Sequence, residues 1–268
     1  MPRTRPSTHP AVRGFDRSAE TYERGRPDYP TRAIDHLGRV LHLGPGTTIV
    51  ELGSGTGKLT RGLARVGAAR VAVEPMPGMR RVFARTVPEV PVLEGTAEAI
   101  PLPDRFADAV VAGQAFHWFD PKRAMPEIAR VLRPGGGIGL VWNYRDESVA
   151  WSKRLSEIVG EYRRRSYPRA DTSPAPTTRD ERWRRAIAGA HSPFGPLHHR
   201  TFSHVQRASR ATFVDRALSI SVIAILPPAE RRRVAARVRA VMHADRRTRG
   251  RRVLEMPMRT EVYWAFRR

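Results

Sequence analysis

The sequence predicts an α/β fold with a doubly wound, mostly parallel sheet, and three observations support this prediction. A β-branched apolar run at residues 48–52 is typical of a buried strand, and it is followed by glycines at positions 53, 55 and 57. A second apolar run, at residues 71–73, ends in Glu74. Apolar residues at helical spacing follow both runs. Strands and helices that alternate in this way form a parallel sheet with helices on both faces.

The glycine turn after the first strand indicates a ligand-binding loop. Glycine has no Cβ, so its backbone can adopt positive φ and approach a ligand closely. A Walker A loop is excluded, because Leu59 follows Lys58 and Leu52 stands where that loop needs its first glycine. The dinucleotide pattern G-x-G-x-x-G is weakened by Lys58 at its last position. A purely structural turn explains one or two glycines, but not three after a strand that carries an acid.

What remains is the pattern E-x-G-x-G-x-G at residues 51–57, which resembles the first motif of class I S-adenosylmethionine-dependent methyltransferases. Three later segments resemble the same family in the same order: the acid-ended strand at 71–74, residues 95–111, and the turn and strand at 132–143. The resemblance implies a Rossmann-like sheet of seven strands, with an N-terminal lid and a helical cap, that binds S-adenosyl-L-methionine.

Two further segments narrow the resemblance to one branch of that family. Residues 15–30 carry a Phe, Tyr, Arg-Pro and Tyr-Pro series, and residues 116–120 read F-H-W-F-D. Both are similar to trans-aconitate methyltransferase-like proteins, within the methyltransferase type 11 branch that also includes enzymes of ubiquinone and menaquinone biosynthesis. This similarity implies a small-molecule methyl acceptor.

The resemblance also implies a set of cofactor-binding residues. Glu74 is expected to accept hydrogen bonds from both ribose hydroxyls, and Met76 or Met79 to lie against the adenine unless they only pack in the core. Thr96 stands where many relatives carry an aspartate that binds the adenine amino group, which moves the expected contact to Ala97 or Glu98. The full expected set is Glu51, Gly53, Ser54, Gly55, Gly57, Glu74, Pro75, Met76, Met79, Thr96, Ala97, Glu98, Gln114, Tyr22 and Arg26.

The acceptor side is expected at the end of the fourth strand, where aromatic residues follow one another. His117 is the candidate catalytic base for a hydroxyl or amine acceptor, although an orienting or packing role explains it equally well. A carboxylate acceptor needs no base and suits an arginine clamp instead. The expected substrate contacts are Tyr29, His117, Trp118, Phe119, Asn143 and Tyr144.

Charge is the unusual feature of the composition. The chain has 48 basic and 26 acidic residues, a net charge of +22, and 45 of the basic residues are arginine. Residues 151–268 hold 27 of the basic and 10 of the acidic residues, a net charge of +17. This excess predicts an alternative function, an RNA-modifying methyltransferase or RNA-binding protein, although solvated helix faces explain it as well. A cofactor-binding protein without turnover is a third possibility.

The remaining expectations concern compartment and organisation. The chain has no cysteine, which favours a reducing, cytoplasmic compartment, and its three nearby histidines lack a carboxylate partner, so we expect no metal. We expect one soluble domain, with a proline-rich loop at 168–178 in its cap. The expected boundaries are a disordered tail at 1–12, lid helices at 13–45, the cofactor-binding core at 46–147, the substrate cap at 148–200 and the rest of the sheet and helices at 201–268.

Overall fold

The computed structural model describes residues 16, 18–166, 181–189 and 192–268. The tail expected at residues 1–12 and the loop expected at 168–178 lie outside the described residues. The strands are β1 Thr48–Leu52, β2 Ala69–Val73, β3 Val92–Leu93, β4 Ala107–Gly113, β5 Leu132–Arg145, β6 His198–Ser209 and β7 Val253–Phe266. The helices are α2 Ala19–Gly25, α3 Thr31–Val40, α4 Lys58–Leu63, η1 Ala64–Val66, α5 Pro77–Thr86, η2 Phe116–Trp118, α6 Pro121–Val131, α7 Ala150–Ser166, α8 Glu181–Ala188, α9 Arg210–Leu218, α10 Ser221–Ala224 and α11 Pro228–Ala244.

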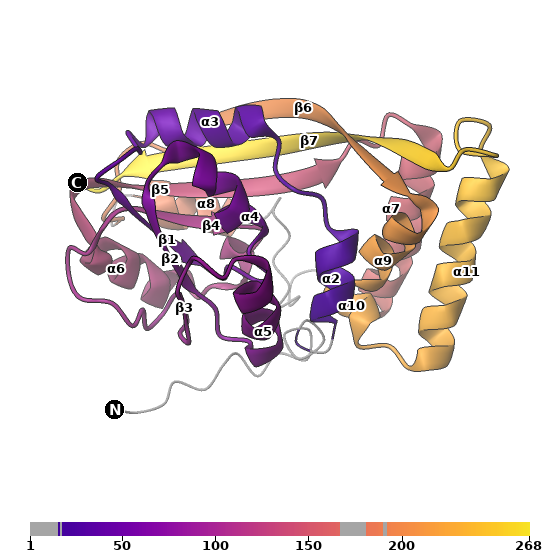
Figure 1. Cartoon of the computed structure of the whole chain (residues 1–268), viewed down its shortest axis with the longest axis horizontal. Helices are drawn as coiled ribbons and strands as arrows, with labels where there is room; N and C mark the ends of the chain where they lie inside the picture. The colour runs from indigo at the N-terminus through magenta and orange to yellow at the C-terminus, as the bar shows by residue number, and fades with distance from the viewer. Residues whose placement is uncertain (1–15, 17, 167–180, 190–191) are drawn as a thin grey trace.

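The strands of the described residues form one sheet in the order β3-β2-β1-β4-β5-β7-β6 (Figure 1). β1 to β5 pair in parallel, whereas β7 runs antiparallel between β5 and β6. The chain winds outward from β1 in one direction and from β4 in the other, so the loops after these two strands separate at the carboxyl edge. Doubly wound sheets bind ligands in the crevice that this reversal leaves. The predicted seven-stranded α/β sheet is confirmed.

Helices cover both faces of the sheet because its central strands are apolar on both sides. On one face, Ile34 and Leu37 of α3 pack with Val111 and Val141. On the other face, α6 and α8 pack together against the intervening strand residues, with Ile128 in the shared core. Alternate residues of one strand therefore enter two different cores, as the twofold repeat of a strand requires.

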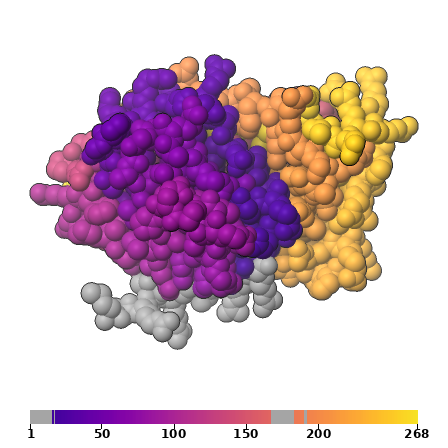
Figure 2. All heavy atoms as spheres, viewed as in Figure 1, coloured from indigo at the N-terminus to yellow at the C-terminus, as the bar shows by residue number. Residues whose placement is uncertain are grey.

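The second half of the chain adds a helical lobe, which we define as α7, α9, α10 and α11 together with the outer halves of β6 and β7. Its core contains Trp151, Phe213, Val238 and Met256, which come from three of these helices and from β7. The strands β5, β6 and β7 run on from the cofactor half toward this lobe (Figure 1). In the space-filling view, indigo residues of the N-terminal segment lie directly against orange residues of the lobe (Figure 2).

The last two strands are longer than the sequence suggests. β6 and β7 pair over twelve consecutive positions, from His198 opposite Trp264 to Ser209 opposite Val253. Buried Leu254, Met256 and Met258 alternate with exposed residues, which is the pattern of a strand with one face on a core. Pro257 interrupts the sequence signal, because proline removes a donor from the ladder.

The glycine-rich turn expected before the fifth strand is a bulge inside β5. The register jumps from Ala107 opposite Leu132 to Ala109 opposite Gly137, so the intervening β5 residues leave the ladder. Gly135, at φ +76°, allows the reversal. The expected glycine turn is therefore present, but it lies within β5 and not ahead of it.

Candidate functional site

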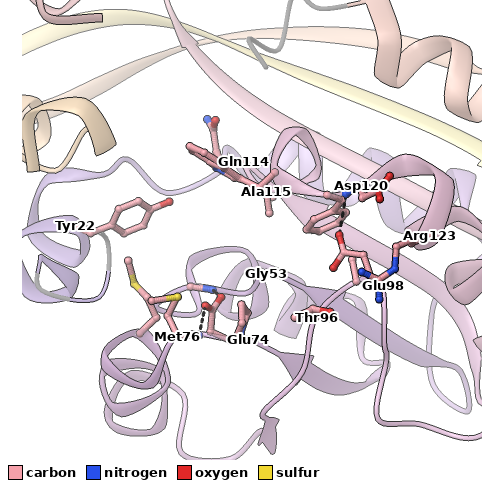
Figure 3. Close-up of a pocket in the computed structure, with 17 residues that line it drawn as sticks. Tyr22, Gly53, Glu74, Met76, Thr96, Glu98, Gln114, Ala115, Asp120 and Arg123 are labelled. Carbon is pink, nitrogen blue, oxygen red and sulfur yellow. Dashed lines mark hydrogen bonds between the residues drawn. The ribbon is translucent and has the colours of Figure 1, made fainter. Parts of the chain in front are cut away.

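A cavity of about 320 Å³ lies at the carboxyl edge of β1, β2 and β4, at the crevice of the sheet. Figure 3 shows Tyr22 and Met76 toward one end of this pocket, Glu98 and Arg123 toward the other, and Glu74 between them. The expected residues that line it are Tyr22, Gly53, Gly55, Glu74, Pro75, Met76, Met79, Thr96, Ala97, Glu98, Gln114, Trp118 and Phe119. The residues that the family resemblance implied therefore make up most of the pocket lining.

The glycine turn gives the pocket its shape. Gly53 has φ +63°, and a Cβ there would lie 2.7 Å from the Cβ of Ala115. Gly55 has φ +57°, and a Cβ there would meet no atom within 4 Å. The turn is thus closely packed on the β4 side and open at Gly55, which leaves room for a ligand beside the backbone.

Glu74 is the best-positioned polar group in the pocket. Its Oε2 accepts a hydrogen bond from the Gly55 N–H at 2.8 Å, and its Oε1 accepts one from the Met76 N–H at 2.9 Å. Burial of the carboxyl, which is 4% exposed, raises its pKa to about 7 despite these bonds. A carboxylate oxygen accepts more than one hydrogen bond, so both oxygens retain capacity for the hydroxyls of a ribose.

Four residues that sequence reasoning missed complete the lining: Gly113, Ala115, Asp120 and Arg123. Asp120 caps α6 by accepting from the Lys122 N–H at 3.1 Å, and its own N–H donates to Glu98 at 2.8 Å. An Asp-Pro pair is a helix-start signal, so the sequence held a clue to Asp120. Arg123 has no such signal, because only the path of α6 brings it to the pocket.

Several expected cofactor residues lie behind the pocket wall. Glu51 accepts a hydrogen bond from the Thr60 hydroxyl, and burial raises its pKa to about 8. Gly57, at φ +88°, packs against Val87, where a Cβ would lie 2.5 Å from Cγ2. The hydroxyl of Ser54 is buried and has no hydrogen-bond partner among the described residues. Their contact with a cofactor stays a prediction.

Arg26 was expected near the methionine carboxylate, but it is directed at the helical lobe. Its Nε donates to the Ser219 hydroxyl at 3.1 Å and its Nη2 to the Ser219 carbonyl at 3.3 Å. The guanidinium carbon lies 4.9 Å from the centre of the Tyr22 ring. Arg26 therefore links the N-terminal segment to α9, and it does not line the pocket.

Tyr29 and Asn143, two of the expected substrate contacts, lie beside the pocket, where Asn143 is hydrogen-bonded to the expected cofactor residue Gln114. Gln114, at φ +57°, donates from Nε2 to the Asn143 carbonyl at 2.8 Å. Asn143 donates to the Asp28 carbonyl at 3.2 Å, which fixes the segment that carries Tyr29. The Tyr29 hydroxyl packs against Gly113, where a Cβ would lie 2.5 Å away. Burial raises the pKa of Tyr29 well above its usual value, so its phenol stays protonated.

His117 and Tyr144 do not line the pocket. Trp142 Nε1 donates to His117 Nδ1 at 3.4 Å, so the neutral ring holds its proton on Nε2. Burial, with the positive charges of Arg163 and Arg26, lowers the pKa of His117 to about 3. A ring in this state is a hydrogen-bond donor and a poor proton acceptor, which favours an orienting role over the predicted base.

Known proteins resemble this chain in sequence and in fold. Residues 50–139 match the model of a methyltransferase domain family. An uncharacterized methyltransferase-like protein of Schizosaccharomyces pombe is 35% identical over 226 residues, 84% of each chain. The chain belongs to the class I S-adenosylmethionine-dependent methyltransferases. S-adenosylmethionine is the cofactor of this family, and the open glycine turn with Glu74 beside it suits the sugar of that cofactor.

Other relatives of this methyltransferase are similar over part of their length or in fold alone. An uncharacterized methyltransferase of Mycobacterium tuberculosis is 51% identical over 146 residues, which span 54% of this chain and 58% of that protein. The solved structure of a putative type II methyltransferase from Anaeromyxobacter dehalogenans has a TM-score of 0.61 and 23% identity, and covers 91% of this chain and 97% of its own.

The described part of the methyltransferase holds no group of three or more histidines and acids arranged to bind a metal. Within the same residues, every helix is too short or too polar to cross a bilayer.

Proposed function

We propose that this methyltransferase transfers the methyl group to an oxygen atom of a small molecule. The oxygen belongs to a carboxylate or to a hydroxyl group. The observation that carries the proposal is that α2 contributes Tyr22 to the wall of the pocket while it packs between α5 and α9 (Figure 1). Arg24 of α2 pairs with Asp215 of α9 at 2.9 Å. An acceptor group covered in this way suits a small molecule better than a nucleotide within a long chain.

The cofactor supplies an electrophilic methyl group on a positively charged sulfur. The residues of the chain provide position and a dry site, which is most of what an in-line displacement needs. Glu74 would accept from the ribose hydroxyls, and the glycine turn would contact the amino-acid end. Trp118, Phe119 and Tyr22 line the pocket, and their aromatic rings would exclude water from it.

The deciding experiment is an incubation of the purified protein with methyl-labelled S-adenosylmethionine and a cell extract divided into small-molecule and RNA fractions. Mass spectrometry identifies the product that gains the label. We expect the label in an oxygen-methylated small molecule. Label that enters RNA alone, with RNA affinity that falls steeply with salt, would replace this proposal by the RNA alternative.

The matched control is Glu74→Ala, which removes the expected ribose contact and leaves the acceptor side intact. This variant should lose labelling and S-adenosylhomocysteine binding together. A wild-type protein that binds S-adenosylhomocysteine but labels nothing in either fraction would instead be a binding protein without turnover.

A further inference from the structure

Arg145, which is partly buried, and Arg216, which is buried, are two cations without an anionic partner among the residues that the structure describes. Arg216, on α9, is 6% exposed, and its Nη1 contacts the Gln206 amide oxygen and the Sδ atoms of Met256 at 3.3 Å and Met258 at 3.2 Å. Its Nε and Nη2 have no hydrogen-bond partner among the described residues, yet they are not among the buried atoms closed off from solvent. Both atoms therefore keep some solvent-accessible surface although the residue is buried.

Arg145 lies on the same face of the sheet. It stands directly opposite Met258 in the β5–β7 register, and residues opposite each other project from one face. Because Met258 contacts Arg216, the two guanidinium groups converge on one region. The Arg145 side chain makes no hydrogen bond or ion pair within the part of the chain that the structure describes.

Arg26 adds a third positive charge beside the pair. Its hydrogen bonds go to Ser219, one turn beyond Arg216 on the same helix end, and the Ser219 hydroxyl also donates to the Arg216 carbonyl at 2.9 Å. Burial is the main cause that lowers the pKa of both arginines, and neighbouring positive charges lower it further. The pKa of Arg145, with Arg26 nearby, falls to about 10, and that of Arg216, with Arg145 and Arg26 nearby, falls well below its usual value. Burying such charges without an anion costs free energy.

The acids of the surrounding elements are paired with other cations. Asp215 pairs with Arg24 at 2.9 Å, Asp28 with Lys58 at 3.1 Å, and Glu23 with Arg61 at 2.6 Å. Glu147 is exposed. Its charge raises the pKa of Arg145, but burial and Arg26 lower it more strongly. A buried cation is normally paired with an anion. The described part of the chain supplies no such anion to Arg145 and Arg216.

The position of the cluster connects it to the acceptor side. Gln114, in the pocket wall, donates to the carbonyl of Asn143, and Arg145 follows Asn143 on the same face of β5 at a spacing of about 7 Å. This face of β5 therefore leads from the region beside Gln114 toward the arginines. We propose that Arg145 and Arg216, with Arg26 beside them, bind a carboxylate or phosphate group of the methyl acceptor. This inference deepens the proposed function and rests on it.

The test measures anion binding separately from cofactor binding. Calorimetry and thermal melts are run with succinate and with inorganic phosphate, at ionic strength held constant with sodium chloride. We expect one of the two anions to bind the wild-type protein and raise its Tm. Binding of succinate alone identifies a carboxylate, and binding of phosphate alone identifies a phosphoryl group. A wild-type protein that binds neither anion would overturn the inference.

Three variants locate the effect. Arg145→Gln and Arg216→Met should each weaken anion binding at least tenfold, while Arg239→Gln, an exposed arginine on α11, should not change it. Arg216→Met should melt at or above the wild-type temperature, because it replaces an unpaired buried charge with an apolar side chain between two methionines. Equal anion binding in both buried-site variants and the wild type, or an equal loss in Arg239→Gln, would refute the proposed site.

The outcomes distinguish this inference from the proposed function. Binding of S-adenosylhomocysteine to the wild type and to Arg145→Gln shows that the cofactor half is intact. A protein that ignores S-adenosylhomocysteine refutes the methyltransferase activity itself. A protein that binds S-adenosylhomocysteine but neither anion refutes the arginine site alone.

Discussion

The ionisation of Glu74 should control the affinity of the methyltransferase for its cofactor. Its pKa is raised to about 7 by burial, and only the carboxylate form accepts hydrogen bonds from both ribose hydroxyls. We therefore expect S-adenosylhomocysteine affinity to rise about tenfold per pH unit below pH 7 and to level off above it. Calorimetry between pH 5.5 and 8.5 measures this slope. Glu74→Gln should bind weakly with no such slope, and an equal slope in that variant would assign the titration to another group.

His117 offers a test of orientation against proton transfer. The neutral ring accepts from Trp142 on Nδ1 and presents an N–H on Nε2, so an amide side chain can replace it as a donor. We expect His117→Asn to keep turnover within about tenfold of the wild type and to keep its cofactor affinity. Removal of a general base typically costs about 10²–10⁴-fold, and a loss of that size in steady-state rates would restore the base assignment.

At the scale of elements, the contact between α2 and α9 depends on Gly25. A Cβ at this position would lie 2.3 Å from the Arg216 backbone nitrogen, and backbone atoms cannot move aside. We expect Gly25→Ala to separate the two helices, with a loss of about 1–3 kcal/mol in unfolding free energy and a larger loss of methyl transfer. Urea unfolding and product formation measure the two effects.

Gly44→Ala is the matched control for that substitution. A Cβ on Gly44 would come no closer than 4.0 Å to its nearest neighbour, the Val66 carbonyl oxygen, and the position does not need positive φ. It should remain within about 0.5 kcal/mol of the wild type. Similar losses in both variants would show that the helix contact is not the cause.

The elements also show what the sequence can and cannot predict. The glycine turn and Glu74 were predictable because a strand, a turn and an acid at fixed spacing are local features. The arginine cluster was not, because Arg145 and Arg216 look like any of the other arginines until β5, β7 and α9 bring them together. Trp183 joins Trp142 and Tyr263 in the core for the same reason, since their contact depends on tertiary packing of α8.

At the scale of the whole molecule, two buried glutamates make stability depend on pH. Burial raises the pKa of Glu51 to about 8 and of Glu74 to about 7, above the value near 4.5 of an unfolded chain. A group whose folded pKa is raised contributes stability that is lost as pH rises through that pKa. The pKa values of His36, His117 and His204 are lowered from the usual 6.5, so these histidines titrate below the pH at which the two glutamates do.

We therefore expect the cofactor-free protein to lose about 2–3 kcal/mol of unfolding free energy between pH 6.5 and 8.5. Urea midpoints at constant ionic strength measure the change. Glu51→Gln cannot titrate and should flatten most of the profile. A wild-type profile that is already flat, or one unaffected by this substitution, would contradict the assignment.

The uninterrupted ladder of β6 and β7 has a consequence for where the molecule can open. Because the same strands belong to the cofactor half and to the helical lobe, rotating one half against the other would break backbone hydrogen bonds along their whole length. The contact between α2 and α9, by comparison, has no strand pairing and rests on the close packing of Gly25 against Arg216 and on the side-chain contacts of Arg24 and Arg26. Separation of α2 from α9 would leave the strand pairing intact, so this contact is the one that can open at the lower cost in backbone hydrogen bonds.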